Sequence, residues 1–100
     1  MKHKSSKLAR AERNRYSIYT DDFNHCYYCK RETKTDKHEV YGGSNRLRSI
    51  QNGLVVPLCR MCHGNEGIIS LLKIECQKIY ELNHSREEFI NLIGRNYIDE

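Results

Sequence analysis

Near its middle the chain reads Leu54-Val55-Val56-Pro57-Leu58-Cys59-Arg60-Met61-Cys62-His63. The apolar run before Cys59 is the most strand-like segment of the sequence, and Asn52-Gly53 ahead of it is typical of a turn. A second Cys-x-x-Cys pair, Cys26-Tyr27-Tyr28-Cys29, lies upstream, with 29 residues between the two pairs. Four thiols at this spacing are typical of a tetrahedral zinc site. We predict one structural zinc ion per chain, bound by Cys26, Cys29, Cys59 and Cys62.

The number and setting of the cysteines favour metal binding over disulfides. The chain has five cysteines, an odd number, and its charged start, Met1-Lys2-His3-Lys4, lacks the apolar segment of a secretory signal. No apolar run approaches the roughly 20 residues that span a membrane. We therefore expect a cytoplasmic protein with metal-bound thiolates and no membrane partner. The fifth cysteine, Cys76, falls on the apolar face of a predicted helix and is expected in the core.

Positive charge is concentrated at the N-terminus. The net charge is +4, yet residues 1–20 contain six of the 17 Lys and Arg side chains and one of the 13 acidic ones. A basic arm is a common means of holding nucleic acid, and a solvated tail is the alternative explanation. We divide the chain into a basic N-terminal arm or short helix over residues 1–15 and one domain over residues 16–100. A hydrophobic content of 38% supports one small core.

The pattern of apolar residues predicts an α+β domain. Short strands are expected over residues 39–41 and 54–58, paired as an antiparallel ribbon with a long arginine-bearing loop between them. Apolar residues recur at spacings of three and four over residues 68–82, which indicates an amphipathic helix. Ser85 and Glu88 form a capping-box signal for a further helix that ends near Gly94.

Two histidines lie close to the thiols in the sequence. His38 begins the first predicted strand and His63 follows the last cysteine of the pairs, so pairing of the strands would direct both into one cleft. Four sulfurs already complete a structural zinc site, and the imidazoles are surplus to it. Together with Glu39 they could bind a second divalent ion and activate water. Considered singly, each histidine is more often a surface residue.

Three segments follow one another in a recognisable order. A Cys-x-x-Cys pair is followed by His38-Glu39-Val40-Tyr41-Gly42-Gly43-Ser44-Asn45-Arg46, and then by Gly53-Leu54-Val55-Val56-Pro57-Leu58 with Cys59-Arg60-Met61-Cys62-His63. This order resembles the HNH endonucleases of the His-Me finger, or ββα-metal, superfamily, especially the small members encoded by phages and prophages. The resemblance covers residues 16–98. It implies a zinc-stabilised β-hairpin followed by a helix, with a separate catalytic ion such as Mg2+, Mn2+ or Ni2+.

The resemblance also implies roles for individual residues. In the family a histidine on the first strand is the general base for water, and the residue after the last cysteine holds the catalytic metal. These positions correspond to His38 and His63. Alignment on Val40 would instead make His38 a metal ligand and Glu39 the base. His38 is essential under either alignment.

Polar residues around the histidines complete the predicted site. The asparagine of the motif corresponds to Asn52, nearer the second strand, or to Asn45, and either could instead cap a turn. Several arginines near the cleft or in the arm are candidate DNA contacts, with solvated loop arginines as the alternative. These residues are Arg13, Arg15, Arg46, Arg48 and Arg60.

These patterns predict a metal-dependent HNH-type endonuclease that nicks or cuts DNA by hydrolysing phosphodiester bonds. The family association implies phage or prophage DNA metabolism and the cytoplasm of a bacterial host. The alternatives are a non-catalytic, zinc-stabilised module that binds nucleic acid, and a zinc-stabilised protein-interaction domain. His38 with His63 separates the first two, because a module that only binds has no need of two imidazoles in one cleft. Sequence specificity would require a homodimer or a phage protein partner, since so small a chain has little surface for readout.

Overall fold

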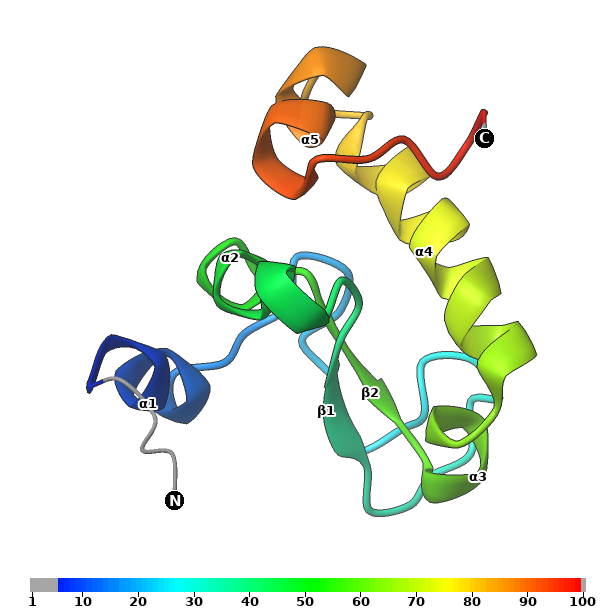
Figure 1. The fold of residues 1–100 in the computed structure, drawn as a ribbon. Coiled ribbons are helices and arrows are strands. Elements are labelled where there is room, and N and C mark those ends of the chain that lie inside the picture. Colours follow the sequence, from blue (N-terminus) through cyan, green and yellow to red (C-terminus); the bar gives the residue numbers. More distant parts are fainter. Residues whose placement is uncertain (1–5, 100) are drawn as a thin grey trace.

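The computed structural model describes residues 6–99. Figure 1 shows a central hairpin with the long helix of residues 66–80 alongside it, and the helices of residues 6–13 and 86–93 at the periphery. Among the described residues, no helix is both long and apolar enough to cross a lipid bilayer. The predicted small α+β fold with a two-stranded antiparallel hairpin is confirmed. The elements in chain order are α1 (Ser6–Arg13), β1 (Asp36–Glu39), the short 3-10 helix η1 (Gly43–Asn45), α2 (Arg46–Gln51), β2 (Val55–Leu58), α3 (Arg60–His63), α4 (Glu66–Tyr80) and α5 (Arg86–Ile93).

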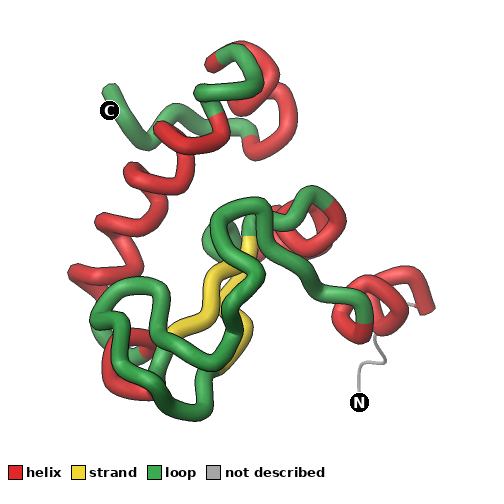
Figure 2. Tube along the Cα trace, turned by 180° about the vertical axis from the view of Figure 1, so that it is seen from behind, coloured by secondary structure: helices red, strands yellow, loops and turns green. Residues whose placement is uncertain are grey.

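The hairpin pairs β1 with β2 in antiparallel register. His38 lies opposite Val56 and Glu39 lies opposite Val55. Every residue of β2 is buried, whereas β1 begins with exposed residues. The predicted second strand is therefore confirmed, while β1 begins three residues earlier than the predicted 39–41 strand. Its apolar content is low, and pairing with the buried β2 sets its limits. Figure 2 shows, from behind, the loop segments that cross the hairpin.

The connection between the strands is partly helical, which differs from the predicted loop. It contains η1 and α2, and α2 buries Ser49 and Ile50. The Ser49 hydroxyl donates a 2.6 Å hydrogen bond to the carbonyl oxygen of Tyr41. Leu, Arg and Gln are good helix formers, but a helix of this length is too short to show a periodic apolar pattern in the sequence. The side chain of Asn45, which precedes α2, does not cap the helix, so no capping signal predicted where α2 begins.

The two C-terminal helices agree closely with the sequence. α4 covers residues 66–80 rather than 68–82, because the Asn65 side chain caps it by accepting a hydrogen bond from the Ile68 N–H. α5 has the predicted capping box at Ser85 and ends at Gly94 with a left-handed φ of 89°. Cys76 is fully buried, as predicted. Buried residues of both helices belong to the same core as Val56 and Leu58 of β2.

An aromatic cluster links the hairpin to α5. The ring of Tyr41 lies 5.2 Å from that of Phe89 and 5.3 Å from that of Tyr97, measured between centroids. The Tyr41 hydroxyl donates a hydrogen bond to the carbonyl oxygen of Lys73 on α4. Edge-to-face and tilted aromatic pairs add to the free energy of simple burial. The end of the chain is therefore held onto the core by Tyr97.

Gly53, at the turn between α2 and β2, is a position where only glycine fits. Its φ is +70°, and a Cβ there would lie 2.5 Å from Cε2 of Tyr16 and 2.9 Å from Cγ2 of Ile18. A left-handed conformation costs other residues roughly 1–2 kcal/mol, and displacing the ring adds to that. We expect Gly53→Ala to lower the free energy of unfolding in urea by about 2 to 3 kcal/mol.

Gly42→Ala is the matched control for this substitution. Gly42 has a φ of −87° and no neighbouring atom within 4 Å of a Cβ built on it. We expect it to change the free energy of unfolding by less than about 0.5 kcal/mol. Equal losses at the two positions would show that the turn does not depend on the left-handed backbone at Gly53.

Candidate metal centre and histidine pair

Four cysteine side chains converge beside the end of β2. Cys26 and Cys29 come from the loop before β1, whereas Cys59 and Cys62 come from the start of α3 and its interior. Their Sγ atoms all lie within 4.8 Å of one another, and no other group of three or more potential ligands was found among residues 6–99. The Sγ atoms of Cys29 and Cys59 are 3.8 Å apart. Zn–S bonds of about 2.3 Å in a tetrahedron require sulfurs about 3.8 Å apart. The four cysteines are thus positioned to bind a metal ion and fit Zn2+.

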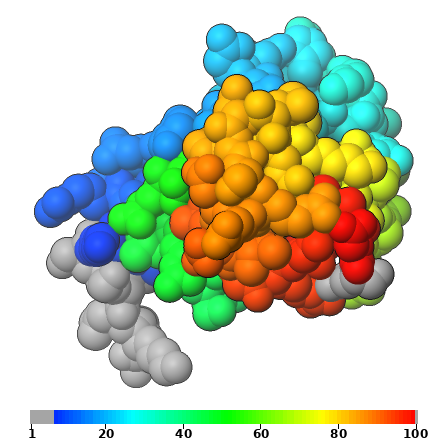
Figure 3. All heavy atoms as spheres, turned by 90° about the horizontal axis from the view of Figure 1, so that it is seen from above, coloured from blue at the N-terminus to red at the C-terminus, as the bar shows by residue number. Residues whose placement is uncertain are grey.

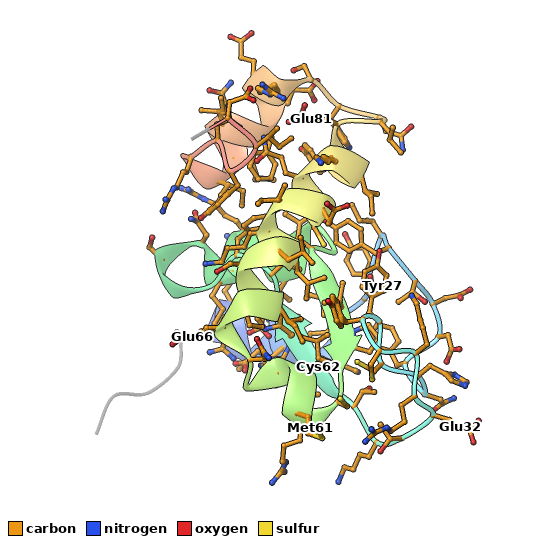
Figure 4. All side chains as sticks on the ribbon, turned by 90° about the vertical axis from the view of Figure 1, so that its right-hand side faces the viewer. Tyr27, Glu32, Met61, Cys62, Glu66 and Glu81 are labelled. Atoms are coloured by element: carbon orange, nitrogen blue, oxygen red, sulfur yellow. The ribbon has the colours of Figure 1, made fainter. Side chains whose placement is uncertain are left out.

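Backbone hydrogen bonds hold the first cysteine pair against the hairpin. The Tyr27 N–H donates to the carbonyl oxygen of Pro57 on β2 at 2.7 Å, and the Lys30 N–H donates to that of Cys26 at 2.9 Å. Lys30 has a φ of +67°, which lets the chain turn sharply after the pair. Figure 4 shows Cys62 at the junction of α3 and this loop, with Met61 pointing outward. The metal centre therefore joins two segments that are distant in sequence.

The thiols differ in how readily they ionise. Burial opposes ionisation of Cys26, but hydrogen bonds from the backbone of Cys59, Cys29 and Tyr28 outweigh it and lower its pKa to about 6. Burial and the neighbouring thiols raise the pKa of Cys62 to about 12. The thiolate form of Cys26 is thus favoured at neutral pH, whereas Cys62 needs a nearby cation to compensate the charge of its thiolate. Deprotonation of the ligands is therefore coupled to metal binding.

Hydrogen bonds of Cys59 and a contact with Asp36 fix the position of His63. The Cys59 sulfur caps α3 by accepting a hydrogen bond from the Cys62 N–H, and the His63 N–H donates to the Cys59 carbonyl oxygen at 2.9 Å. The Nδ1 atom of His63 lies 3.1 Å from a carboxylate oxygen of Asp36 on β1. With the proton on Nδ1, this contact orients the ring and leaves Nε2 with a lone pair, as in many metal-binding histidines.

Asp36 is a site residue that the sequence analysis missed. Alternate residues of a strand share a face, so Asp36 and His38 point to the same side of β1. The Asp-x-His spacing in a strand would have been the signal. It was overlooked because the predicted strand began at residue 39, and the limits of β1 are set by pairing with β2.

The structure brings His38 and His63 together. Their rings are 5.0 Å apart between centroids and meet edge to face at 64°. Nε2 of His38 is buried and has no hydrogen-bond partner among the described residues. Burial above all, and then the charge of His63, lowers the pKa of His38 to about 4, against an opposing effect of Glu39. The imidazole is therefore neutral at neutral pH, and its Nε2 can accept a proton or bind a cation.

Two hollows adjoin the His63–Asp36 pair. His63 lines one of about 510 Å³, and Lys73 lies in its wall. Asp36 lines another of about 350 Å³, with basic side chains around it: Arg31, Lys34 and Arg60. Of the arginines predicted to contact DNA, Arg60 is thus the one that lines a hollow together with Asp36. The hollow at Asp36 is suited to an anionic ligand by the charge of its wall, whereas Glu66 offsets Lys73 in the hollow at His63.

The predicted role of Glu39 at the histidines is corrected by the structure. Glu39 follows His38 in the strand and so points to the opposite face. Its carboxylate pairs with Arg46 Nε at 2.6 Å and with Arg15 at 3.4 Å. Both arginines also contact Glu12 of α1, at 2.6 Å from Arg46 and 3.2 Å from Arg15. Glu39, Arg15 and Arg46 therefore form a network that joins α1 to the hairpin. This network holds the helical part of the predicted N-terminal arm against the domain.

The remaining predicted residues lie apart from the histidine pair. Asn52 caps the end of α2, where its side chain donates to the Arg48 carbonyl oxygen at 2.8 Å. Arg48 itself donates to the carbonyl oxygen of Leu92. Arg13 is exposed at the end of α1. Asn52 therefore acts as a helix cap, which was the structural alternative for it, and Arg48 links α2 to α5.

The ion-pair network predicts a structural role for Glu39 that a mutation can test. The Glu39 side chain is 12% exposed, so Glu39→Gln leaves two arginines with one carboxylate in a partly buried site. We expect the free energy of unfolding to fall by about 1 to 3 kcal/mol. Glu75→Gln, which removes an exposed pair with Lys78, is the control and should cost less than about 0.5 kcal/mol. Equal losses for the Glu39 and Glu75 variants would show that the ion-pair network does not stabilise the fold.

The fold and site define a small α+β domain with a four-cysteine metal centre beside a histidine pair. Comparison with protein-family models, with curated proteins and with solved structures gave no match. The function therefore has to be argued from the geometry of the site.

Proposed function

We propose that this protein is a metal-dependent endonuclease of the HNH type, with a ββα-metal fold, that hydrolyses phosphodiester bonds in DNA. The observation that supports this most is the edge-to-face pair of His38 and His63. The His38 ring has a buried nitrogen with no hydrogen-bond partner within residues 6–99. The His63 ring is oriented by Asp36 and directly follows Cys62, one of the four cysteines positioned to bind a metal ion. A purely structural metal centre requires neither feature.

The order of elements supports the same proposal. β1 provides His38, β2 leads into the second cysteine pair, and α3 and α4 follow directly. His63 lies at the end of α3, beside β1, so both imidazoles project from the same side of the hairpin. This is the arrangement that a nuclease of the proposed class requires: a base on the first strand and a metal ligand after the second.

The roles follow from the environment of each ring. His38, neutral at neutral pH, would accept the proton of the attacking water at Nε2, an atom that is buried and that bound DNA would have to expose. As the water oxygen bonds to phosphorus, the bond to the 3′ oxygen breaks, and that oxygen takes a proton from solvent. An approaching phosphate raises the low pKa of His38, because an anion stabilises the imidazolium form. His63, held by Asp36, presents Nε2 as a ligand. A divalent cation such as Mg2+, Mn2+ or Ni2+ at this position would stabilise negative charge on the phosphate and the leaving oxygen.

Basic side chains around the histidines favour DNA as the partner. Arg60 and Lys73 line the two hollows beside the site, and Arg31 and Lys34 lie near Arg60. These cations can contact phosphates on either side of the scissile bond. They carry no base specificity, so target choice would come from a second copy or from a phage protein partner. Phage or prophage DNA metabolism is the setting that this proposal implies.

Supercoiled plasmid provides the test. The zinc-loaded protein is incubated with plasmid alone or with added Mg2+, Mn2+ or Ni2+, and the products are separated on an agarose gel. We expect open-circular or linear DNA with at least one added ion, and no product when that ion is chelated while the bound zinc, measured in parallel, is retained.

The outcomes separate the candidate functions. Plasmid that stays supercoiled with every ion, although the protein shifts its mobility, would favour a non-catalytic module that binds nucleic acid. Absence of both cleavage and binding would overturn both of these functions and favour a protein-interaction domain.

A further inference from the structure

A groove lies between α1 and α2, and none of its lining residues belongs to the metal centre. It has a volume of about 380 Å³, which is within the range of small-molecule sites. Its floor is apolar, with Ile50 and Ala11, while its rim is basic and aromatic. Figure 3 shows α1, in blue, lying against the green segment that contains α2. The groove is unrelated to the four cysteines and the two histidines.

The wall that α1 provides is fixed in place. Glu12 on its inner face contacts Arg46 at 2.6 Å, and Arg46 contacts Glu39 of β1 at the same distance. The side chains of Glu12 and Glu39 are only 13% and 12% exposed. Partly buried, charge-assisted pairs of this kind hold a helix in one orientation far better than exposed ones. A frayed basic tail would need no such network.

The outer face of α1 is basic. Lys7 and Arg10 are three residues apart, which places them on one side of the helix, and both are exposed and line the groove. Neither forms an ion pair with any other residue within 6–99. Their charges are therefore available to an anionic ligand, unlike those of Arg15 and Arg46.

An exposed aromatic ring faces these cations. Tyr16 lines the groove and is 47% exposed, although its hydroxyl is anchored on the Gln51 carbonyl oxygen at 2.9 Å. The edge of its ring packs against the turn at Gly53, next to Ile18, which is 45% exposed. The ring is thus held rigidly with one part open to solvent. A fixed aromatic surface beside two cations suits a ligand that has both a planar face and a phosphate.

We infer that the groove between α1 and α2 binds an unpaired nucleotide of single-stranded DNA, with phosphates on Lys7 and Arg10 and a base against Tyr16. A duplex does not offer the face of a base, so the groove selects an unpaired strand. This inference rests on the proposed function for its class of partner. It adds a binding site that neither the metal centre nor the histidine pair contains, and it makes the DNA substrate one with unpaired bases.

Fluorescence anisotropy with a short labelled oligothymidylate and a labelled duplex tests the inference. The zinc-loaded full chain is used without added divalent ion, so that no cleavage is needed. We expect Tyr16→Leu to weaken binding of the single strand by at least about fivefold, while Tyr16→Phe retains it and duplex binding does not change. The double substitution Lys7→Gln and Arg10→Gln should reduce the slope of log affinity against log salt by roughly 1.4. Lys78→Gln, on the exposed surface of α4, is the matched control and should leave binding unchanged.

Several results would overturn the inference. Tyr16→Leu with unchanged single-strand affinity, or with equal losses for strand and duplex, would exclude base contact in the groove. Competition by polyglutamate as strong as that by the oligonucleotide would point to an acidic protein partner instead. Circular dichroism and zinc content confirm that each variant is folded. If the plasmid stays intact but the anisotropy results are as expected, the proposed nuclease activity is rejected while single-strand binding in the groove is supported. The failure of one proposal can therefore be distinguished from the failure of the other.

Discussion

Cys59→Ser is expected to remove tight zinc binding and to leave the chain without a cooperative unfolding transition. Cys59 both provides a sulfur to the metal centre and caps α3 through that sulfur. Structural zinc in small domains contributes on the order of 10 kcal/mol, which equals or exceeds the whole stability of a typical domain. Zinc content by atomic absorption and denaturation followed by circular dichroism measure the two effects. A chelator added to the parent protein should reproduce them.

The fifth cysteine provides the control for this substitution. Cys76 is fully buried on α4 but does not belong to the four-sulfur group. We expect Cys76→Ala to retain one zinc per chain and a cooperative transition, with a small loss of stability from the removed sulfur. If Cys59→Ser kept its zinc, or if Cys76→Ala lost it, the assignment of the ligands would be wrong.

His38→Ala is expected to lower the rate of plasmid nicking by about 10²- to 10⁴-fold while zinc content stays at one per chain. General-base catalysis typically accounts for a factor of this size. The His38 ring contacts His63 but does not belong to the group of four cysteines that is positioned to bind zinc. Its loss should therefore leave the metal centre intact. Single-turnover nicking rates, measured with saturating divalent ion, test the prediction.

His63→Ala should show a different pattern. It removes the proposed ligand of the divalent ion, so activity should fall and should respond to added ion concentration more steeply than in the parent. His84→Ala is the control, because His84 stacks on Tyr80 at the far end of α4 and should have no effect on nicking. Loss of zinc from the His38 variant, or equal rates in the His38 and His84 variants, would contradict the proposed site.

Strong local signals in the sequence predicted the matching parts of the fold. The capping box at Ser85, the apolar period of α4 and the buried run of β2 each depend on residues close together in the chain, and each was confirmed. The four cysteines were also predicted, because the chemistry of a tetrahedral ion fixes ligand type and spacing. α2 was missed, since a helix of six residues is stabilised by burial of Ile50 rather than by its own pattern.

The sequence by itself determined the four-cysteine group, the β2 strand, α4 and α5, and it singled out both histidines. Only the tertiary structure decided which side chains meet. The register of β1 placed Asp36 and His38 on one face and turned Glu39 to the other, because side chains alternate along a strand. Folding of α1 against α2 used Arg15 and Arg46 as ion-pair partners and left Lys7 and Arg10 exposed beside Tyr16. Such choices depend on contacts between residues far apart in the chain, and composition and spacing do not encode them locally.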